Sequence, residues 1–221
     1  MKIKIDVKIL FLVLAFYVLG NLSLYLWLMF FAFFHEIFHC IAGAICKYKP
    51  CLFEIKSFGF SVAFSNYIDD YNEKIYMGNL AELKNIFIYL SGPLFNFFAA
   101  LFLYIFKFND VLIYINIILC IFNLIPIIPL DGGRILKSIL HIRYGLKKSY
   151  IIIKNISFAF VIFILMISSI LVIKFENYFF LLSIIYLCIL YYRETEYIQK
   201  KLKIYRLMDT DFSEKNGNFQ L

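Results

Sequence analysis

Charged residues are scarce in this chain of 221 residues, because Asp, Glu, Lys and Arg make up only 17% of it. A typical soluble domain has about a quarter. Proline, with 4 residues, and glycine, with 9, are also few, which excludes a collagen and a Pro- and Gly-rich disordered chain. The 5 cysteines are an odd number without framework spacing, which excludes a disulfide scaffold and predicts reduced thiols. Hydrophobic residues, by contrast, make up 63%. This composition excludes an ordinary water-soluble enzyme and predicts a polytopic membrane protein.

The apolar residues form six runs, and a membrane span needs roughly 20 such residues. The runs cover residues 9–25, 26–46, 86–106, 111–129, 151–173 and 178–192. The first run follows three lysines like a signal peptide, but it lacks a small-x-small cleavage site and is predicted to be a retained span. A Gly20–Asn21 turn is all that separates it from the second run. The expected fold class is an all-α polytopic membrane protein with six transmembrane helices.

The distribution of basic residues predicts how these spans are oriented in the membrane. If the N-terminus is cytoplasmic, 20 of the 22 Lys and Arg residues fall on cytoplasmic segments, and only Lys107 and Lys174 fall outside. Positive charge concentrates in cytoplasmic loops of membrane proteins. Both termini are therefore predicted to be cytoplasmic. The net charge of +7 then needs no nucleic acid to explain it, and no nucleic-acid-binding motif accompanies the charges.

Two segments are not expected to span the membrane. In the connection 47–84, residues 52–56 and 58–64 show partial alternation of apolar and polar residues, which predicts a small membrane-associated β-hairpin between spans two and three. Residues 192–207 are charged and amphipathic and predict a cytoplasmic helix, followed by a loose tail. The expected organisation is a six-span domain over 1–192 and a cytoplasmic helix and tail over 193–221.

The second run contains the string HEIFH, at His35 to His39. Charge inside a membrane is costly, so an intramembrane ionisable residue indicates function. His35 and His39, at i and i+4, share one helix face and can both reach one metal ion. Glu36 is then placed to take a proton from a metal-bound water. A hydrogen-bonded cluster that only packs helices together is the structural alternative.

A catalytic zinc site needs a third protein ligand and an open position for water. Asp131 is the candidate, because it ends the fourth run in the string NLIPIIPLDGGR. Pro126 and Pro129 remove helix hydrogen bonds, and Gly132–Gly133 permits unusual dihedral angles, so an irregular helix end is predicted at membrane depth. The alternative is that Asp131 caps a helix over 134–143.

Two amide side chains within apolar runs accompany these residues. Asn123 is a polar residue in the fourth apolar run and is expected to bind the substrate backbone or to stabilise an oxyanion, with an interhelical hydrogen bond as the alternative. Asn96 lies in the string SGPLFNFF, where Gly92–Pro93 is predicted to kink the third span. Asn96 is expected to hold helices together.

Three strings in order resemble the site-2 protease family of intramembrane zinc metalloproteases, peptidase family M50: HEIFH at 35–39, GPLFN at 92–96 and NLIPIIPLDGG at 123–133. The resemblance covers about residues 22–143. The close spacing of the first two spans and the basic, aromatic segment from Tyr191 are most similar to the branch of the stage IV sporulation protein FB. Members of that branch usually carry a CBS domain, whereas this sequence is expected to carry neither a CBS nor a PDZ domain.

Position by position, the resemblance implies roles for these residues. It implies one zinc ion held by His35, His39 and Asp131, with Glu36 as the general base. The residues assigned to substrate binding are Asn123, Pro126 and Pro129, and those assigned to the structure of the site are Gly92, Pro93 and Asn96.

The resemblance also implies a function. The expected activity is cleavage of membrane-tethered proteins near the cytoplasmic face, with a sporulation sigma factor precursor as one expected substrate and inhibitory membrane proteins as expected partners. The expected location is a bacterial cell membrane or a sporulation membrane. The alternatives are a site-2 protease relative in another signalling or stress pathway, and a metal-binding membrane transporter. A hydrolase needs water, so a polar passage from the cytoplasmic side is expected to reach the metal.

Overall fold

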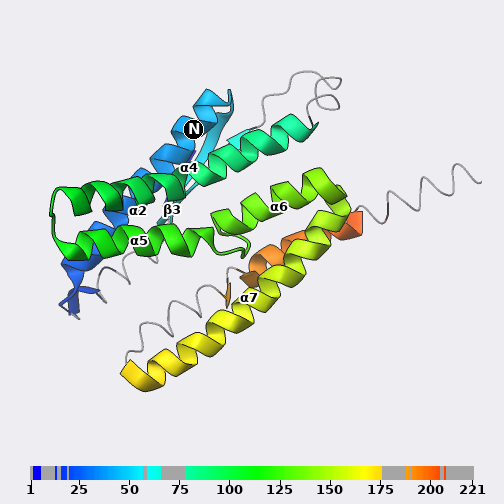
Figure 1. The fold of residues 1–221 in the computed structure, drawn as a ribbon. Coiled ribbons are helices and arrows are strands. Elements are labelled where there is room, and N and C mark those ends of the chain that lie inside the picture. Colours follow the sequence, from blue (N-terminus) through cyan, green and yellow to red (C-terminus); the bar gives the residue numbers. More distant parts are fainter. Residues whose placement is uncertain are drawn as a thin grey trace, which may run out of the picture. The chain divides into compact units, whose positions relative to one another are not determined.

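A computed structural model describes residues 2–5, 13, 16–18, 20–56, 59–65, 78–175, 188–189, 191–204 and 207. The chain forms two compact units, Met1–Leu124 and Ile125–Leu221, and each is described by itself. The first contains the helices α2, α4 and α5 and a small sheet, and the second contains α6 and α7 (Figure 1).

Helix α2, Leu22–Ile45, begins directly after a turn at Gly20. Gly20 has φ +70°, its N–H donates to Tyr17 O, and the N–H of Asn21 donates to Phe16 O. This is the Schellman pattern that ends a helix at a residue with positive φ, where glycine is favoured. The predicted boundary between the first two runs therefore lies at Gly20–Asn21. The helix starts four residues before the predicted Leu26, because nothing after the turn opposes helix formation.

Helices α4, Gly78–Ile105, and α5, Asp110–Leu124, are joined by a short turn. Lys107 in this turn has φ +54° and repeats the Schellman pattern, with the N–H of Phe108 donating to Leu103 O. Both helices pack against α2. Phe31 of α2, Leu103 of α4 and Ile115 of α5 form one buried apolar cluster among them.

A three-stranded sheet completes the first unit, with strand order β1-β2-β3. Strands β2, Lys49–Lys56, and β3, Gly59–Ser65, pair antiparallel over the segment for which the hairpin was predicted, with Phe53 opposite Val62. Residues 57–58 lie outside the described residues. Strand β1, Lys2–Ile5, pairs parallel with β2 and was not predicted. Its four residues are too few for alternation to distinguish a strand from a basic flank.

The second unit begins with an irregular segment, residues 125–130, followed by α6, Asp131–Tyr144, and α7, Leu146–Phe175. Residues 191–204 are helical, in the region where the amphipathic helix was predicted. The buried side chains of Ile128, Tyr150, Ile153 and Ile198 pack together, so this last helix is attached to α7 through its apolar side.

Three described helices are long and apolar enough to cross a membrane: Leu22–Ile45, Asn79–Ile105 and Leu146–Ser169. Helix α5 is a shorter apolar helix of 15 residues, about 22 Å long at a rise of about 1.5 Å per residue. Many large apolar side chains on these helices are exposed, as lipid-facing residues are. The first and sixth predicted runs lie mostly outside the described residues, so the count of six spans stays a prediction.

Candidate metal centre

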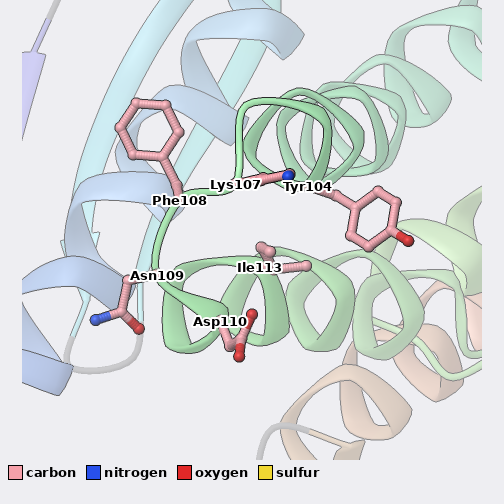
Figure 2. Close-up of a pocket in the computed structure, with 6 residues that line it drawn as sticks. All are labelled: Tyr104, Lys107, Phe108, Asn109, Asp110 and Ile113. Carbon is pink, nitrogen blue, oxygen red and sulfur yellow. The ribbon is translucent and has the colours of Figure 1, made fainter.

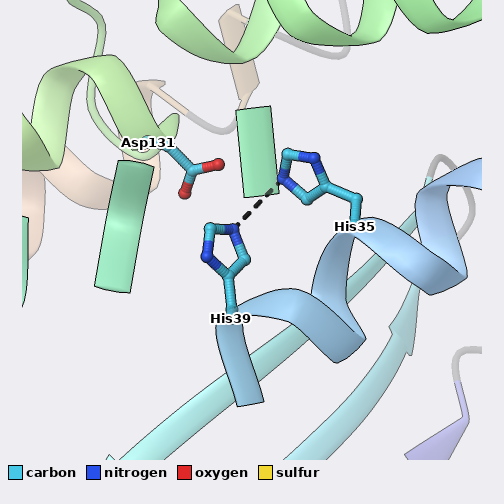
Figure 3. A group of neighbouring side chains, drawn as sticks. All are labelled: His35, His39 and Asp131. Carbon is cyan, nitrogen blue, oxygen red and sulfur yellow. Dashed lines mark hydrogen bonds between the residues drawn. The ribbon is translucent and has the colours of Figure 1, made fainter. Parts of the chain in front are cut away.

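The two histidines of HEIFH face each other on consecutive turns of α2 (Figure 3). His35 and His39 are 4% and 5% exposed, and their Nε2 atoms are 3.2 Å apart. The i, i+4 spacing produces this arrangement, because residues four apart lie above one another on a helix. Two buried imidazole nitrogens at this distance can share one proton or one metal ion.

Helix α4 holds the other nitrogen of each ring. His39 Nδ1 lies 2.7 Å from the carbonyl oxygen of Ile88, and the Ser91 hydroxyl donates to the same oxygen at 2.7 Å. Ser91 Oγ is also 3.3 Å from His39 Nδ1. Asn96 Nδ2 lies 3.0 Å from His35 Nδ1. Histidines that bind a metal through Nε2 are usually oriented by such contacts at Nδ1.

Gly92 leaves room for the two rings. A Cβ atom built on Gly92 would lie 2.5 Å from His39 Nε2 and 2.6 Å from His35 Nε2, closer than real carbon atoms approach. Ile88, Gly92 and Asn96 recur every four residues, so one face of α4 follows the histidines of α2. Helix α4 runs through the buried Pro93 as one continuous helix, and the predicted kink there stays a prediction.

Aromatic stacking fixes how α2 and α4 lie against each other beside the histidines. Phe95 of α4 stacks on two rings of α2, with centroid distances of 4.5 Å to Phe38 and 6.0 Å to Phe34. Glu36, between His35 and Phe38 in the chain, is half-buried on α2. The rings therefore hold the helix segment that carries both the histidines and the glutamate.

In the second unit, Asp131 is buried, at 7% exposure, and is the first residue of α6. The N-cap is Leu130, which makes no side-chain cap hydrogen bond. The alternative that Asp131 caps a helix starting at residue 134 is therefore wrong, since Asp131 already lies inside the helix. A carboxylate in the first turn is favoured there by the helix dipole.

The two glycines after Asp131 do not serve the purpose that was predicted for them. Gly132 and Gly133 are helical and are not among the described residues with positive φ, so unusual dihedral angles are not their role. A Cβ atom on Gly133 would lie 2.5 Å from the carbonyl carbon and oxygen of Ile127. Gly133 is needed because the backbone of the irregular segment passes this close.

The irregular segment itself was predicted from its prolines, and α5 indeed ends at Leu124. The Ile128–Pro129 peptide bond is cis. Ser157 of α7 satisfies the segment's backbone: the Ile128 N–H donates to Ser157 Oγ at 3.2 Å, and that hydroxyl donates to Pro126 O at 3.4 Å. Pro126 and Pro129 are half-buried, and their predicted contact with substrate is not tested by these contacts.

Asn123 is half-buried near the end of α5, and its Nδ2 donates to Leu119 O in the same helix at 3.0 Å. This contact tests neither the predicted binding of substrate by Asn123 nor the alternative of an interhelical hydrogen bond.

The residues suit a zinc ion. His35, His39 and Asp131 are all buried, and each carries an atom that can ligate a metal. Imidazole nitrogen and carboxylate oxygen are both zinc ligands, and three protein ligands leave a fourth position for water. Gly92 keeps side-chain atoms away from both Nε2 atoms. The Ile88 carbonyl and the Ser91 hydroxyl were missed from the sequence, because a backbone carbonyl has no sequence signal and serine is common in helices.

A pocket elsewhere in the first unit contains none of the predicted site residues. It lies at the turn between α4 and α5 (Figure 2) and is lined by Tyr104, Lys107, Phe108, Asn109, Asp110 and Ile113. Its residues do not include a histidine or a cysteine, and it is not a candidate for the metal centre.

Comparisons with known proteins agree with one another. The model of peptidase family M50 matches residues 105–168, which include Asn123, Pro126, Pro129 and Asp131 but not HEIFH. A zinc metalloprotease from Methanocaldococcus jannaschii is 38% identical over 91 residues; the match spans 36% of this chain and 27% of that protein. The chain thus matches about a quarter of that relative's length.

The structure of a site-2 protease from Methanocaldococcus jannaschii resembles this one with a TM-score of 0.60 and 23% sequence identity, over 87% of this chain and 90% of that chain. This likeness shows that the two share a fold. Neither comparison singles out the sporulation branch. The family model, the curated relative and the solved structure together support the peptidase M50, or site-2 protease, family for this chain.

Proposed function

We propose that this protein is an intramembrane zinc endopeptidase that cleaves membrane-tethered proteins near the cytoplasmic face. One observation carries the proposal: two buried histidines on an apolar helix place their Nε2 atoms 3.2 Å apart, with both Nδ1 atoms held by α4. A metal-binding transporter would need polar residues along several spans, whereas α7 has few polar side chains between Ser157 and Ser168.

The proposed roles follow from the chemistry of each side chain. His35, His39 and Asp131 would hold the zinc ion, which when bound polarises a water molecule and the scissile carbonyl. Glu36 would accept the proton from that water and deliver it to the nitrogen of the leaving amine. Asn123 would bind a backbone N–H of the substrate through its amide oxygen.

The substrate must be extended at the cut, since a helix hides its peptide bonds in internal hydrogen bonds. Among the described strands, β3 lies at an edge of the sheet, and it packs against α2, the helix of the histidines. We propose that the substrate adds to this edge as a further strand. The variants Ser61→Pro and Val62→Pro test this, because proline lacks a backbone N–H. Only one of these two neighbouring residues directs its N–H to the outer edge of β3. Equal cleavage by both variants would contradict it.

We also propose which branch of the family this protein belongs to. The short turn between the first two runs and the helix at 191–204 support the sporulation branch, with the precursor of a sporulation sigma factor as substrate. Co-expression with that tethered precursor tests the branch. Cleavage of other tethered proteins but not of this precursor would place the enzyme in another pathway.

Glu36→Gln tests the catalytic assignment in cells that co-express a tethered substrate. Cleavage should fall by about 10²–10⁴-fold, the usual contribution of a general base, while zinc content stays at the wild-type level. Glu196→Gln is the matched control, because Glu196 is exposed on the helix at 191–204. Retained cleavage by an inserted Glu36→Gln protein would overturn the assignment.

Asp131→Ala tests the third ligand. Zinc measured in the purified protein should fall well below one ion per chain, because two histidines alone hold zinc weakly. Zinc content equal to that of the wild type would exclude Asp131 as a ligand.

A further inference from the structure

Asn96 is fully buried on α4, at 0% exposure, and only half of its amide is used. Its Nδ2 is 3.0 Å from His35 Nδ1. Its Oδ1 is buried and has no hydrogen-bond partner within the described part of the chain. A buried acceptor left without a partner destabilises the folded protein. Because Asn96 lies beside His35, a second orientation of its amide would bring this oxygen to the ring.

With the Asn96 Nδ2 as a donor, the contacts around the histidines imply one arrangement of the ring protons. The Asn96 N–H donates to His35 Nδ1, so the proton of the neutral His35 ring is on Nε2. That Nε2–H donates to His39 Nε2, and the His39 proton, on Nδ1, is donated to the Ile88 carbonyl. In this arrangement each of these contacts joins a donor to an acceptor.

Metal binding changes the requirement at His35 alone. A ligand imidazole must offer Nε2 without a proton, and the proton must then be on Nδ1 and meet an acceptor. His39 already meets this condition through the Ile88 carbonyl. His35 does not, because an N–H group of Asn96 faces its Nδ1. The acceptor it needs is the other end of the same amide.

We propose that Asn96 is a positioning residue that turns its amide by half a rotation when zinc binds, so that Oδ1 accepts the Nδ1–H of His35. The inference rests on the proposed function and deepens it by assigning what orients one ligand. Amide oxygen and nitrogen have nearly the same shape, so the turn needs no new space. His39 already carries its proton on Nδ1, as a metal ligand requires, whereas His35 can bind the metal only when the Asn96 amide has turned.

The test compares Asn96→Leu with Asn96→Asp in the purified full-length protein in detergent micelles, with zinc affinity measured by competition with a chelator. Asn96→Leu removes the acceptor and should weaken zinc binding by about 10–100-fold, as losses of such supporting contacts do. Asn96→Asp keeps an acceptor oxygen and should stay within about tenfold of the wild type. A packing role predicts the reverse, since leucine fills the space and aspartate adds buried charge.

Asn116→Leu is the matched control. Asn116 is also fully buried, its Oδ1 also has no partner among the described residues, and its Nδ2 donates to Leu112 O in its own helix α5. Its zinc affinity should equal that of the wild type. A loss of affinity as large as that of Asn96→Leu would overturn the inference, because any buried amide would then have the same effect.

The outcomes separate this inference from the proposed function. If the wild type binds zinc and His35→Ala abolishes binding, but Asn96→Leu binds as well as the wild type, the inference alone fails. If the wild type shows no zinc binding that depends on His35, the proposed function fails. If Asn96→Leu does not fold, Asn96→Asp decides, and a loss beyond tenfold there overturns the inference.

Discussion

Helix propensity and packing predict opposite effects for the substitution Gly92→Ala. Alanine stabilises a helix relative to glycine by up to about 1 kcal/mol, so Gly92→Ala should help α4 on propensity alone. The added methyl group would instead meet His39 Nε2 at 2.5 Å and His35 Nε2 at 2.6 Å. We expect the methyl group to displace both rings, and zinc content to fall below about a tenth of wild type. Metal analysis of the purified protein measures this.

Leu94→Ala is the control for Gly92→Ala. Leu94 lies two residues away on α4 and is 41% exposed, so its side chain does not face the histidines. Its zinc content should match that of the wild type. Normal zinc content in Gly92→Ala would mean that the rings can move without losing the metal, and would contradict the prediction.

The residues of the candidate site were predictable from the sequence, whereas those that orient them were not. His35, Glu36 and His39 stand out because ionisable groups are rare in apolar runs. Ile88 supports His39 through its backbone carbonyl, which no sequence pattern reports. The role of Gly133 was misassigned, because the close approach of the Ile127 backbone depends on the path of the chain. The chemistry of a side chain is known from the residue type alone, whereas the packing that orients it depends on residues far apart in the sequence.

Among the secondary-structure elements, hydropathy predicted the long helices but not the residues at which they begin and end. Helices α2, α4 and α7 each coincide with a predicted run, because a lipid-exposed span must be continuously apolar. Helix α4 begins at Gly78, eight residues before the predicted run at Ile86, since its first turns are polar and outside the hydropathy signal. Strand β1 was missed because it pairs with residues of β2 that lie 50 positions further along the chain, such as Lys2 with Leu52.

Ser157 connects two elements of the second unit, and its removal should be costly. It is fully buried, accepts from the Ile128 N–H and donates to Pro126 O. Ser157→Ala leaves both backbone groups without these partners, and we expect the free energy of unfolding to fall by about 1–3 kcal/mol. Unfolding in mixed micelles with increasing SDS measures this difference.

Ser168→Ala provides the comparison for Ser157→Ala. Ser168 is buried on the same helix, but its hydroxyl donates only to Leu165 O within α7. We expect a change of less than about 0.5 kcal/mol, since that carbonyl belongs to the helix ladder. Equal losses in the two variants would show that the hydroxyl of Ser157 does not stabilise the irregular segment.

For the whole molecule, the exposed apolar side chains and the charged side chains indicate two different surroundings, lipid and water. Phe97, Phe98 and Phe102 on α4 are more than half exposed, which water would penalise and lipid does not. The Lys and Arg residues, apart from Lys154, lie outside the six predicted apolar runs. The apolar surface therefore indicates where lipid lies, and the charges predict which side is cytoplasmic.

Lys107 and Lys148 should lie on opposite sides of the membrane, because they occupy opposite ends of the predicted spans. Lys107 is one of two basic residues predicted outside, and Lys148 is one of 20 predicted inside. Both side chains are exposed, so a cysteine at either position can react. In a background with the five native cysteines replaced by alanine, a membrane-impermeant maleimide should label Lys107→Cys in intact cells. It should label Lys148→Cys only after permeabilisation, because a polar reagent does not cross the bilayer. The reverse pattern would invert the orientation and place the catalytic face outside. Labelling of both in intact cells would mean that the helices between them do not span the membrane.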